Sequence, residues 1–281
     1  MIQDIYPSRF KNEYKDYVIR DEDNLLAFDK DGKILIRDVQ GKIEFLKGSD
    51  VKDKNTIYLF GIDDKRYFLL DSFKDDIRNE CEEDGGLAYY TIREIRDTFS
   101  GTSMVEVYAA FTAYHLWRWY AENRFCGRCG TPLKHSDKER ALICPDCGSV
   151  IYPRINPAVI VAVTKGDRLL LTRYRSGYAH NALVAGFTEI GETLEETVAR
   201  EVMEETGVRV KNIRYYKSQP WGMAQDMLVG FYCEADGSGE IHMDENELKY
   251  AEWVKREDVV LQPSDISLTN EMMKLFRDGN I

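Results

Sequence analysis

The sequence of 281 residues has no long hydrophobic run. Its longest apolar stretch, around residues 157–163, is far too short to span a bilayer as a helix. The first residues alternate charged and aromatic side chains and contain no apolar core of a signal peptide. Internal repeats and low-complexity tracts are absent as well. We therefore expect a soluble, cytoplasmic protein of two or three units, without a membrane partner.

Positive charge is also scarce. The chain has 38 Lys and Arg residues against 49 Asp and Glu residues, which gives a formal net charge of −11. Such a balance argues against broad, non-specific binding to a polyanion. It leaves open the recognition of one phosphorylated end that is held by a metal and a local basic pocket.

Cysteine is used six times, and four of the cysteines form two tight pairs. The pairs are Cys126 with Cys129, and Cys144 with Cys147. In a reducing compartment this spacing favours metal binding over disulfides, and glycines in both knuckles permit the tight turns. Four thiolates make the closed shell of a structural zinc site, so we predict a zinc ribbon over 123–153. Two disulfides or free thiols are the alternative. The leftover residues, Cys81 and Cys233, are expected to be ordinary buried or half-buried thiols.

Residues 1–122 are predicted to form an α+β domain rich in strands. Asn24–Phe28 and Lys33–Arg37 are short apolar runs joined through Asp31 and Gly32, which indicates a hairpin. Residues 57–60 and 66–70 repeat this pattern. Since the region carries no chemical motif, we expect a scaffold or a dimerisation domain.

A helix over about 104–120 is predicted to close this first domain. Ser103 and Glu106 have the spacing of a capping box, and aromatic residues such as Phe111 and Tyr114 recur at helical spacing. Aromatic stripes of this kind usually pack in a core or at an oligomer interface. The helix is therefore a candidate contributor to a homodimer.

The carboxylate-rich part of the chain is a second predicted helix, Leu194–Thr206, in a domain over 154–281. Thr193 and Glu196 form a capping box before it, and Gly207 is a natural stop after it. Glutamates 201, 204 and 205 stand at positions i, i+3 and i+4, so their carboxylates gather on one side of the helix. Clustered like charges destabilise a helix unless a cation is bound, and dense oxygen ligands suit Mg²⁺ or Mn²⁺.

The same segment resembles the Nudix box. Gly186 is followed after five residues by Glu192, and after seven more by the run REVMEETGV over 200–208. The match holds at every defined position. The resemblance implies an α/β/α sandwich with a mixed sheet, and hydrolysis of a nucleoside diphosphate linked to another moiety.

The resemblance also implies roles for individual residues. Ala185, through its carbonyl oxygen, Glu201 and Glu205 would be metal ligands; Glu204 would be a ligand or a base, and Arg200 would orient the glutamates. Divalent cations on phosphate oxygens would neutralise charge in the transition state and activate a water molecule.

A zinc ribbon directly before a Nudix domain is similar to the NADH pyrophosphatase subfamily, whose members also remove NAD caps from RNA. The motifs RFCGRCG, YPRINPAVI, GFTEIGE and SQPW carry this likeness, from about residue 93 onward. It implies that Glu247 completes the metal site or serves as general base, and that Phe187 stacks on a base. The other implied substrate contacts are Arg93, Glu139, Tyr152, Gln219, Trp221, Asp226 and Ser267.

One loop departs from the subfamily pattern. After Trp221 the subfamily continues with two prolines that flank a phenylalanine and then a serine, whereas this chain has Gly222 to Asp226. We expect the loss of rigid prolines and the added charge of Asp226 to reshape the nucleotide pocket. The metal chemistry should survive, but selectivity for NAD(H) becomes an open question.

Three functions therefore compete. The first is hydrolysis of NADH or NAD⁺ to nicotinamide mononucleotide and AMP, with NAD-capped RNA as a further substrate. The second is cleavage of ADP-ribose, a dinucleoside polyphosphate or another capped RNA. The third is nucleic-acid binding by the ribbon, whose basic side chains are Arg124, Arg128, Lys134, His135, Lys138 and Arg140.

Overall fold

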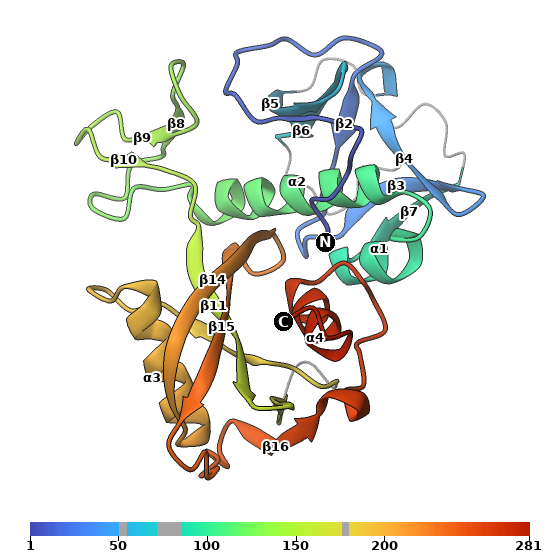
Figure 1. Cartoon of the computed structure of the whole chain (residues 1–281). Helices are drawn as coiled ribbons and strands as arrows, with labels where there is room; N and C mark the ends of the chain where they lie inside the picture. Colours follow the sequence, from blue (N-terminus) through green and yellow to red (C-terminus); the bar gives the residue numbers. More distant parts are fainter. Residues whose placement is uncertain (51–54, 72–85, 176–179) are drawn as a thin grey trace. The chain divides into compact units, whose positions relative to one another are not determined.

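The structure is a computed structural model that describes residues 1–50, 55–71, 86–175 and 180–281. The chain forms two compact units (Figure 1). One comprises Met1–Gln3, Ile155–Trp221 and Asp226–Ile281, and the other comprises Asp4–Arg154 and Gly222–Gln225. No helix within the described ranges has both the length and the apolar character to cross a membrane. The predicted thiol of Cys81 lies outside the described residues.

The first unit is built on a mixed sheet with the strand order β14-β15-β11-β12-β16, and β13 pairs with β11. Its central strand, β11, runs parallel to β15 and antiparallel to β12 and β13. The strands are β11 (Asn156–Lys165), β12 (Arg168–Tyr174), β13 (Val184–Phe187), β14 (Arg209–Trp221), β15 (Asp226–Asp236) and β16 (Leu248–Lys255).

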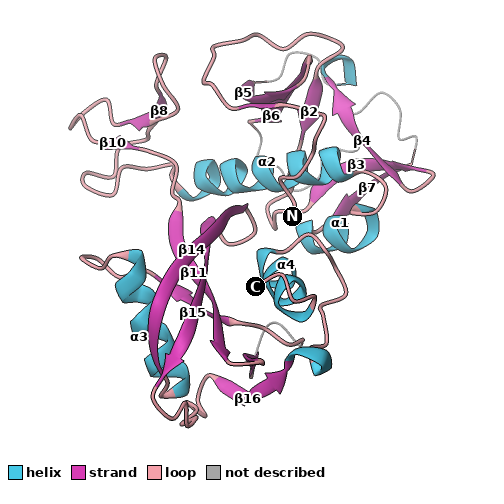
Figure 2. Ribbon diagram, viewed as in Figure 1, coloured by secondary structure: helices cyan, strands magenta, loops and turns pink. Residues whose placement is uncertain are grey.

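Helices cover both faces of this sheet (Figure 2). Alternate residues of β11 point to opposite faces, as the two-residue period of a strand requires. Val159 and Val161 pack in one cluster with Val198 of α3 (Leu194–Thr206), while Ile160 packs in another with Met272 of α4 (Leu268–Arg277). A short 3₁₀ helix, η3 (Arg256–Asp258), precedes α4. The predicted α/β/α sandwich is confirmed.

The bounds of α3 are those that the sequence predicts. The hydroxyl of Thr193 accepts from the N–H of Glu196 (3.2 Å), and the Glu196 carboxylate accepts from the N–H of Thr193 (2.8 Å). These reciprocal bonds satisfy two backbone donors at the helix start. Gly207 ends the helix with a φ of 70°, a left-handed conformation that glycine adopts without a steric penalty.

The second unit contains a seven-stranded sheet with the order β1-β5-β6-β2-β4-β3-β7. The same unit contains two helices, α1 (Ile92–Phe99) and α2 (Met104–Glu122). Helix α2 carries the predicted aromatic stripe. The strands, with one 3₁₀ helix, are β1 (Phe10–Lys11), β2 (Asn24–Leu26), β3 (Ile34–Val39), β4 (Lys42–Lys47), η1 (Gly48–Asp50), β5 (Thr56–Ile62), β6 (Lys65–Leu70) and β7 (Leu87–Tyr90).

One of the two predicted hairpins is confirmed in full, and the other is confirmed only next to its turn. β5 and β6 form an antiparallel ladder, as expected. The turn at Gly32 exists and brings Phe28 and Ile34 into an isolated bridge. The strands on either side of that turn are not ladder partners, however, because β2 pairs with β4 and β6, and β3 pairs with β4 and β7.

The predicted capping box at the start of α2 is wrong. In the described part of the chain, the hydroxyl of Ser103 makes no capping bond and accepts instead from the backbone N–H of Ile43 on β4 (3.2 Å). The buried N–H of Ile43 at the strand end needs a hydrogen-bond acceptor, and the Ser103 hydroxyl serves it instead of the first N–H groups of α2.

The last part of the second unit is a small three-stranded sheet of β8 (Lys134–His135), β9 (Leu142–Ile143) and β10 (Val150–Ile151). It contains the two cysteine knuckles. Tyr14 donates from its hydroxyl to the carbonyl of Ser136 (2.7 Å), so this sheet is tied to the remainder of its unit. Whether residues 1–122 and 123–153 act as separate domains stays a prediction.

Candidate active site

The three glutamates of α3 differ sharply in exposure. The side chain of Glu204 is 60% exposed and that of Glu201 is 13% exposed, whereas Glu205 as a residue is 2% exposed. The helix packs through Val198 and Val202, so positions 201 and 205 lie at the margin of the core. A buried carboxylate without a cation is unfavourable, so this arrangement calls for a positive partner.

Glu201 lies against the backbone of Gly186 at the end of β13. A Cβ atom at position 186 would overlap the carboxyl group of Glu201. Glycine is therefore required here because a side chain would not fit. The φ angle of Gly186 is not positive, so backbone conformation alone would allow another residue. The strand and the helix approach closely enough to present the carbonyl of Ala185 and the carboxylate of Glu201 on neighbouring elements.

Arg200 connects the motif through one guanidinium group. Its Nε donates to Glu192 (2.6 Å), its Nη1 donates to Glu201 (2.8 Å) and Glu204 (3.0 Å), and its Nη2 donates to the carbonyl of Phe187 (2.9 Å). The orienting role implied for Arg200 fits these contacts. The ion pair between Arg200 and Glu192 was not predicted from the sequence, although Glu192 is a defined position of the motif.

The same contacts shift the acidity of the two partners. The hydrogen bonds from Arg200 lower the pKa of Glu192 to about 2. The bonds to Glu192, followed by those to Glu201 and Glu204, raise the pKa of the Arg200 guanidinium. Glu192 is thus ionised and locked, and it serves to hold Arg200 in place.

Glu205 sits in the opposite electrostatic situation. Its pKa is raised to about 8, mainly by burial and also by the nearby charges of Glu201 and Glu247, although a hydrogen bond from Tyr174 lowers it. Burial also raises the pKa of Glu201. Tyr174 donates to Oε1 of Glu205 at 3.1 Å and was not foreseen, because a tyrosine that ends an apolar strand carries no signal in the sequence.

Glu247 lies in the segment between β15 and β16. This segment is held by hydrogen bonds from the N–H of Asp244 to the carbonyl of Glu205 (2.9 Å) and from the N–H of Leu248 to the carbonyl of Asp244 (2.9 Å). The side chain is exposed, and its charge acts on both Glu201 and Glu205. The backbone bonds place Glu247 at the carboxyl end of α3.

The oxygen donors of this region fit a hard divalent cation. Carboxylates and a backbone carbonyl are the ligands that Mg²⁺ and Mn²⁺ prefer. Burial raises the pKa values of both Glu201 and Glu205, and Arg200, the cation beside Glu201, is shared with Glu192 and Glu204. Metal roles for Ala185, Glu201, Glu205 and Glu247 stay predictions.

The four paired cysteines form a compact group. Among the described residues, they are the only set of three or more His, Cys, Asp or Glu side chains whose ligand atoms all lie within 4.8 Å of one another. The Sγ atoms of Cys126 and Cys147 are 3.6 Å apart, and those of Cys129 and Cys144 are 3.4 Å apart. All four are free thiols, so the disulfide alternative falls and a structural zinc site is supported. The predicted burial of Cys233 is confirmed.

The predicted substrate contacts occupy varied positions. In the second unit, the hydroxyl of Tyr152 donates to Glu139 (3.0 Å), and Arg93 is exposed on α1. In the first unit, Phe187 is 52% exposed at the end of β13, and Trp221 ends β14. These four exposed or half-exposed positions are compatible with ligand contact, and their roles stay predictions.

Three further predicted contacts have structural partners. Gln219 is fully buried, and its amide joins Leu268 and Ile266 at the start of α4 (2.7 Å each). Ser267 caps α4 by accepting from the N–H of Asn270 (3.1 Å). The side chain of Asp226 is buried at the start of β15.

The altered loop forms a tight turn in which Gln225 has a φ of 61°. Residues 222–225 belong to the second unit. A Cβ atom at position 222 would overlap the carbonyl oxygen of Phe111 in α2, so Gly222 is needed for this close approach. Proline would not fit at this position.

The predicted basic surface of the ribbon needs one correction. Arg140 is half-buried and donates to Oδ1 of Asn12 (2.8 Å) and to the carbonyl of Leu59. It is thus engaged in packing and does not share the exposed surface. The exposed members of the set are Arg124, Arg128, Lys134, His135 and Lys138.

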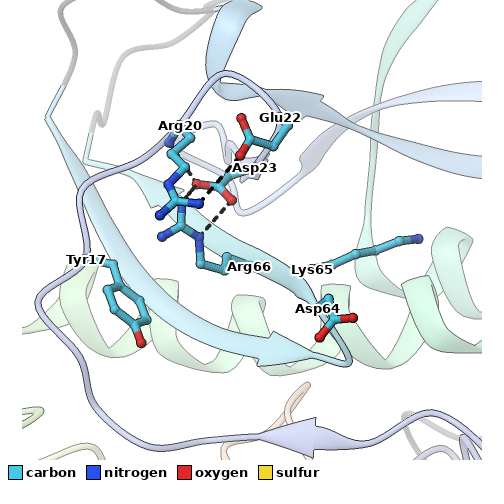
Figure 3. Close-up of a pocket in the computed structure, with 7 residues that line it drawn as sticks. All are labelled: Tyr17, Arg20, Glu22, Asp23, Asp64, Lys65 and Arg66. Carbon is cyan, nitrogen blue, oxygen red and sulfur yellow. Dashed lines mark hydrogen bonds and ion pairs between the residues drawn. The ribbon is translucent and has the colours of Figure 1, made fainter.

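A polar pocket of about 390 Å³ lies elsewhere in the second unit (Figure 3). Arg66 donates from Nε to Asp23 (2.9 Å) and lies over the ring of Tyr17 (5.3 Å). Three cationic and three anionic side chains balance in this pocket, so no net charge would attract a polyphosphate. Its lining residues are Tyr17, Arg20, Glu22, Asp23, Asp64, Lys65 and Arg66.

Comparisons with known proteins match two segments of the chain. Residues 154–276 match the model of the NUDIX domain, and residues 121–152 match that of the NADH pyrophosphatase zinc ribbon domain. These two segments contain the carboxylate helix and the four cysteines respectively.

Curated relatives named NAD-capped RNA hydrolase NudC are similar over the same region. The Citrobacter koseri protein is 46% identical over 151 residues, which cover 53% of this chain and 58% of that protein. The Salmonella typhi protein is 41% identical over 174 residues, 62% of this chain and 66% of that protein. The Klebsiella pneumoniae protein is 40% identical over 190 residues, 66% of this chain and 70% of that protein. The aligned part thus spans less than two thirds of the first two relatives.

Proposed function

Since this chain belongs to the Nudix hydrolases and carries the zinc ribbon of the NADH pyrophosphatases, we propose that it hydrolyses the pyrophosphate bond of NAD⁺ and NADH. The products would be nicotinamide mononucleotide and AMP. We further propose that it removes NAD caps from RNA, as the names of its relatives suggest.

One observation carries this proposal. Buried Glu205 and nearly buried Glu201 stand beside a strand end that offers the carbonyl of Ala185, while Arg200 holds the surrounding acids in place. Such a set of oxygens binds a divalent cation in contact with phosphate oxygens. The zinc ribbon that precedes this domain in the sequence matches that of the NADH pyrophosphatases, and this match supports NAD(H) as the substrate.

We assign the cation as Mg²⁺ or Mn²⁺. When bound, it would neutralise phosphate charge and lower the pKa of a water molecule. Glu201 and Glu205 would hold it, and Arg200 would keep Glu201 oriented through its 2.8 Å bond. Exposed Glu204 and Glu247 are the two carboxylates accessible to take a proton from the attacking water.

The proposal is tested with purified zinc-loaded protein and Mg²⁺ or Mn²⁺. NADH, NAD⁺, ADP-ribose, a dinucleoside polyphosphate and NAD-capped RNA are supplied in ¹⁸O-labelled water, and products are read by chromatography and mass spectrometry. We expect AMP and nicotinamide mononucleotide, with the label on one of them identifying the attacked phosphorus. Intact NAD(H) alongside cleavage of another diphosphate would reject the NAD(H) assignment.

Another diphosphate substrate is the second candidate, and the altered loop favours it. Gly222 packs against α2 where a proline would not fit, and Asp226 is buried at the loop end. The sequence of this loop thus differs from the subfamily pattern at positions that are tightly packed or buried. Comparison of kcat/KM for NADH and ADP-ribose separates the two candidates.

Nucleic-acid binding by the ribbon is a candidate from another class. Its exposed cations, Arg124, Arg128, Lys134, His135 and Lys138, would attract an RNA backbone. If binding is the whole function, Glu205→Gln should leave RNA affinity unchanged, and the wild-type protein should show no turnover. If the protein is an enzyme, the same change should abolish turnover.

We propose that the protein acts as a cytoplasmic homodimer. Most apolar and aromatic side chains of α2 are buried within the chain itself, so support for the dimer comes from the resemblance to the subfamily and not from this helix. Sedimentation equilibrium tests the oligomeric state, and fractionation of cells that express the protein tests its location.

A further inference from the structure

Tyr174 lies at a break in the regular pairing of the first unit. It is the last residue of β12, and the register between β12 and β16 shifts between Arg173 and Tyr174. A bulge of this kind re-aims the side chain that follows it. The hydroxyl of Tyr174 is thereby directed toward the carboxylate helix, where it meets Glu205.

This hydroxyl contacts two of the predicted metal ligands at once. It accepts from the backbone N–H of Ala185 (3.1 Å) and lies 3.1 Å and 3.3 Å from the two carboxylate oxygens of Glu205. A phenol has one proton to donate and lone pairs to accept. Since the Ala185 N–H already donates to the phenol oxygen, the phenol proton has the Glu205 carboxylate and the Ala185 carbonyl as acceptors, and Oε1 of Glu205 at 3.1 Å is nearer than the carbonyl oxygen at 3.4 Å.

The next residue reaches the third predicted ligand through the backbone. The N–H of Arg175 donates to the carbonyl of Glu247 (2.9 Å), and its guanidinium donates to the carbonyl of Glu245. The end of β12 therefore contacts the segments that carry Ala185, Glu205 and Glu247. A shift at this strand end would be transmitted to all three.

We propose that Tyr174 is a positioning residue of the divalent-metal site, which fixes the Glu205 carboxylate relative to the Ala185 carbonyl through its hydroxyl group. The inference rests on the proposed metal-dependent function. Glu205 is 2% exposed and has little water to orient it, so a protein donor must set the direction of its oxygens. Hydrogen-bond partners behind metal ligands typically change metal affinity by about ten- to a hundred-fold when they are removed.

A second phenol–carboxylate pair offers a matched control. Tyr216 on β14 donates to Glu271 on α4 at 2.6 Å, in the same unit but on the other face of the sheet. Removal of either hydroxyl deletes one oxygen and one hydrogen bond to a glutamate. Only the first pair involves a predicted metal ligand.

The test is a calorimetric titration of Mn²⁺ into the zinc-loaded full chain, without substrate. Tyr174→Phe should weaken Mn²⁺ binding by about ten-fold or more, whereas Tyr216→Phe should leave it unchanged. Thermal unfolding in the absence of divalent cations checks that both variants are folded. In turnover assays, Tyr174→Phe should raise the Mn²⁺ concentration needed for half-maximal rate, and saturating Mn²⁺ should recover most of kcat.

Two further variants separate positioning from packing. Replacement of Tyr174 by 4-aminophenylalanine keeps a donor at the same ring position and should restore Mn²⁺ affinity. In a double-mutant cycle, Tyr174→Phe should add little to the loss caused by Glu205→Gln, because it acts through that residue. If Tyr174→Phe is too unstable to titrate, the 4-aminophenylalanine protein is still testable, and a loss of Mn²⁺ binding there would contradict the inference.

Wild-type Mn²⁺ affinity in folded Tyr174→Phe would overturn the inference whatever the protein hydrolyses. Conversely, a protein that binds Mn²⁺ with the expected dependence on Tyr174 but cleaves no diphosphate would refute the proposed function alone. The binding and turnover measurements thus fail independently.

Discussion

The carboxylate of Glu201 occupies the space beside Gly186 that a side chain at position 186 would fill. Strand β13 and helix α3 can approach this closely only because position 186 has no Cβ atom. The contact explains why the motif begins with glycine, and it sets the distance between the strand end and the carboxylate helix.

Gly186→Ala should therefore lower activity severely. The added methyl group must displace Glu201 or separate β13 from α3, and either shift disturbs the 2.8 Å bond from Arg200 to Glu201. We expect a fall in kcat/KM of about a hundred-fold, as a displacement of roughly 1 Å can cause. Steady-state kinetics on the preferred diphosphate measures this. Gly101→Ala is a control for a glycine substitution as such, since a Cβ atom there would meet open space and the φ angle of Gly101 lies outside the left-handed region. Equal losses in the two variants would contradict the steric account.

Arg200→Lys should lower kcat although the positive charge is kept. Arg200 donates to Glu192, Glu201, Glu204 and the carbonyl of Phe187 from one planar group, and an ammonium group cannot reproduce that fork. We expect a loss of about ten- to a hundred-fold. Arg168→Lys, at an exposed position of β12, is the matched control. Full activity of Arg200→Lys would show that charge alone suffices at this position.

Helix α3 could be predicted to the residue because its signals are local. The capping pair Thr193 and Glu196 and the stop at Gly207 need no tertiary partner to act. Ser103 has the same local signal and still failed, since the N–H of Ile43, sixty residues earlier, competes for its hydroxyl. Helix α2 nevertheless begins at Met104, where the sequence predicts it, so the distant donor changed the capping bond and not the element.

The site shows the same division. Glu201 and Glu205 follow from helical spacing, and their unequal burial follows from the position of Val202 in the core. Tyr174 joins them only through a register shift between two strands that are about seventy residues apart, which leaves no trace in local composition. Gln219, a predicted substrate contact, is fully buried, and its amide bonds to Ile266 and Leu268 at the start of α4, a pairing that local sequence does not reveal.

Glu205 should make the metal-free protein less stable as the pH rises. Its pKa is about 8 in the folded state against an ordinary value of 4.5, so the folded state retains a proton that the unfolded state loses between these values. The free energy of unfolding should therefore fall from about pH 4.5 to about pH 8, by something on the order of a few kcal/mol. Urea denaturation without Mg²⁺ or Mn²⁺ measures the slope. Glu205→Gln should flatten it, and a slope that survives this change would assign the effect to other groups.

Glu192 should act in the opposite direction. Arg200 holds its pKa at about 2 in the folded state, below the ordinary value of 4.5. The stabilisation is thus present above about pH 4.5 and is lost as the pH falls toward 2. Glu192→Gln should make acid unfolding less steep in this window, and circular dichroism during acid titration measures it. An unchanged acid transition would mean that the Arg200 contacts contribute nothing to stability there.

Removal of zinc should unfold the ribbon. The strands β8, β9 and β10 have only two residues each and cannot hold the knuckles by themselves. The ligand atoms of the four cysteines, in contrast, all lie within 4.8 Å of one another. In zinc-finger peptides the metal supplies about 10–16 kcal/mol at neutral pH, which is folding free energy. Cys144→Ser should therefore lose bound zinc and lower the temperature of the first unfolding transition, measured by elemental analysis and calorimetry. Cys233→Ala, which removes a buried thiol of the other unit, should keep the zinc.

Since Tyr14 and Arg140 tie the ribbon to its own unit, the unfolding transition that shifts should be that of the second unit. A protein that folds and melts like the wild type after losing its zinc would show that these packing contacts, and not the metal, hold the ribbon.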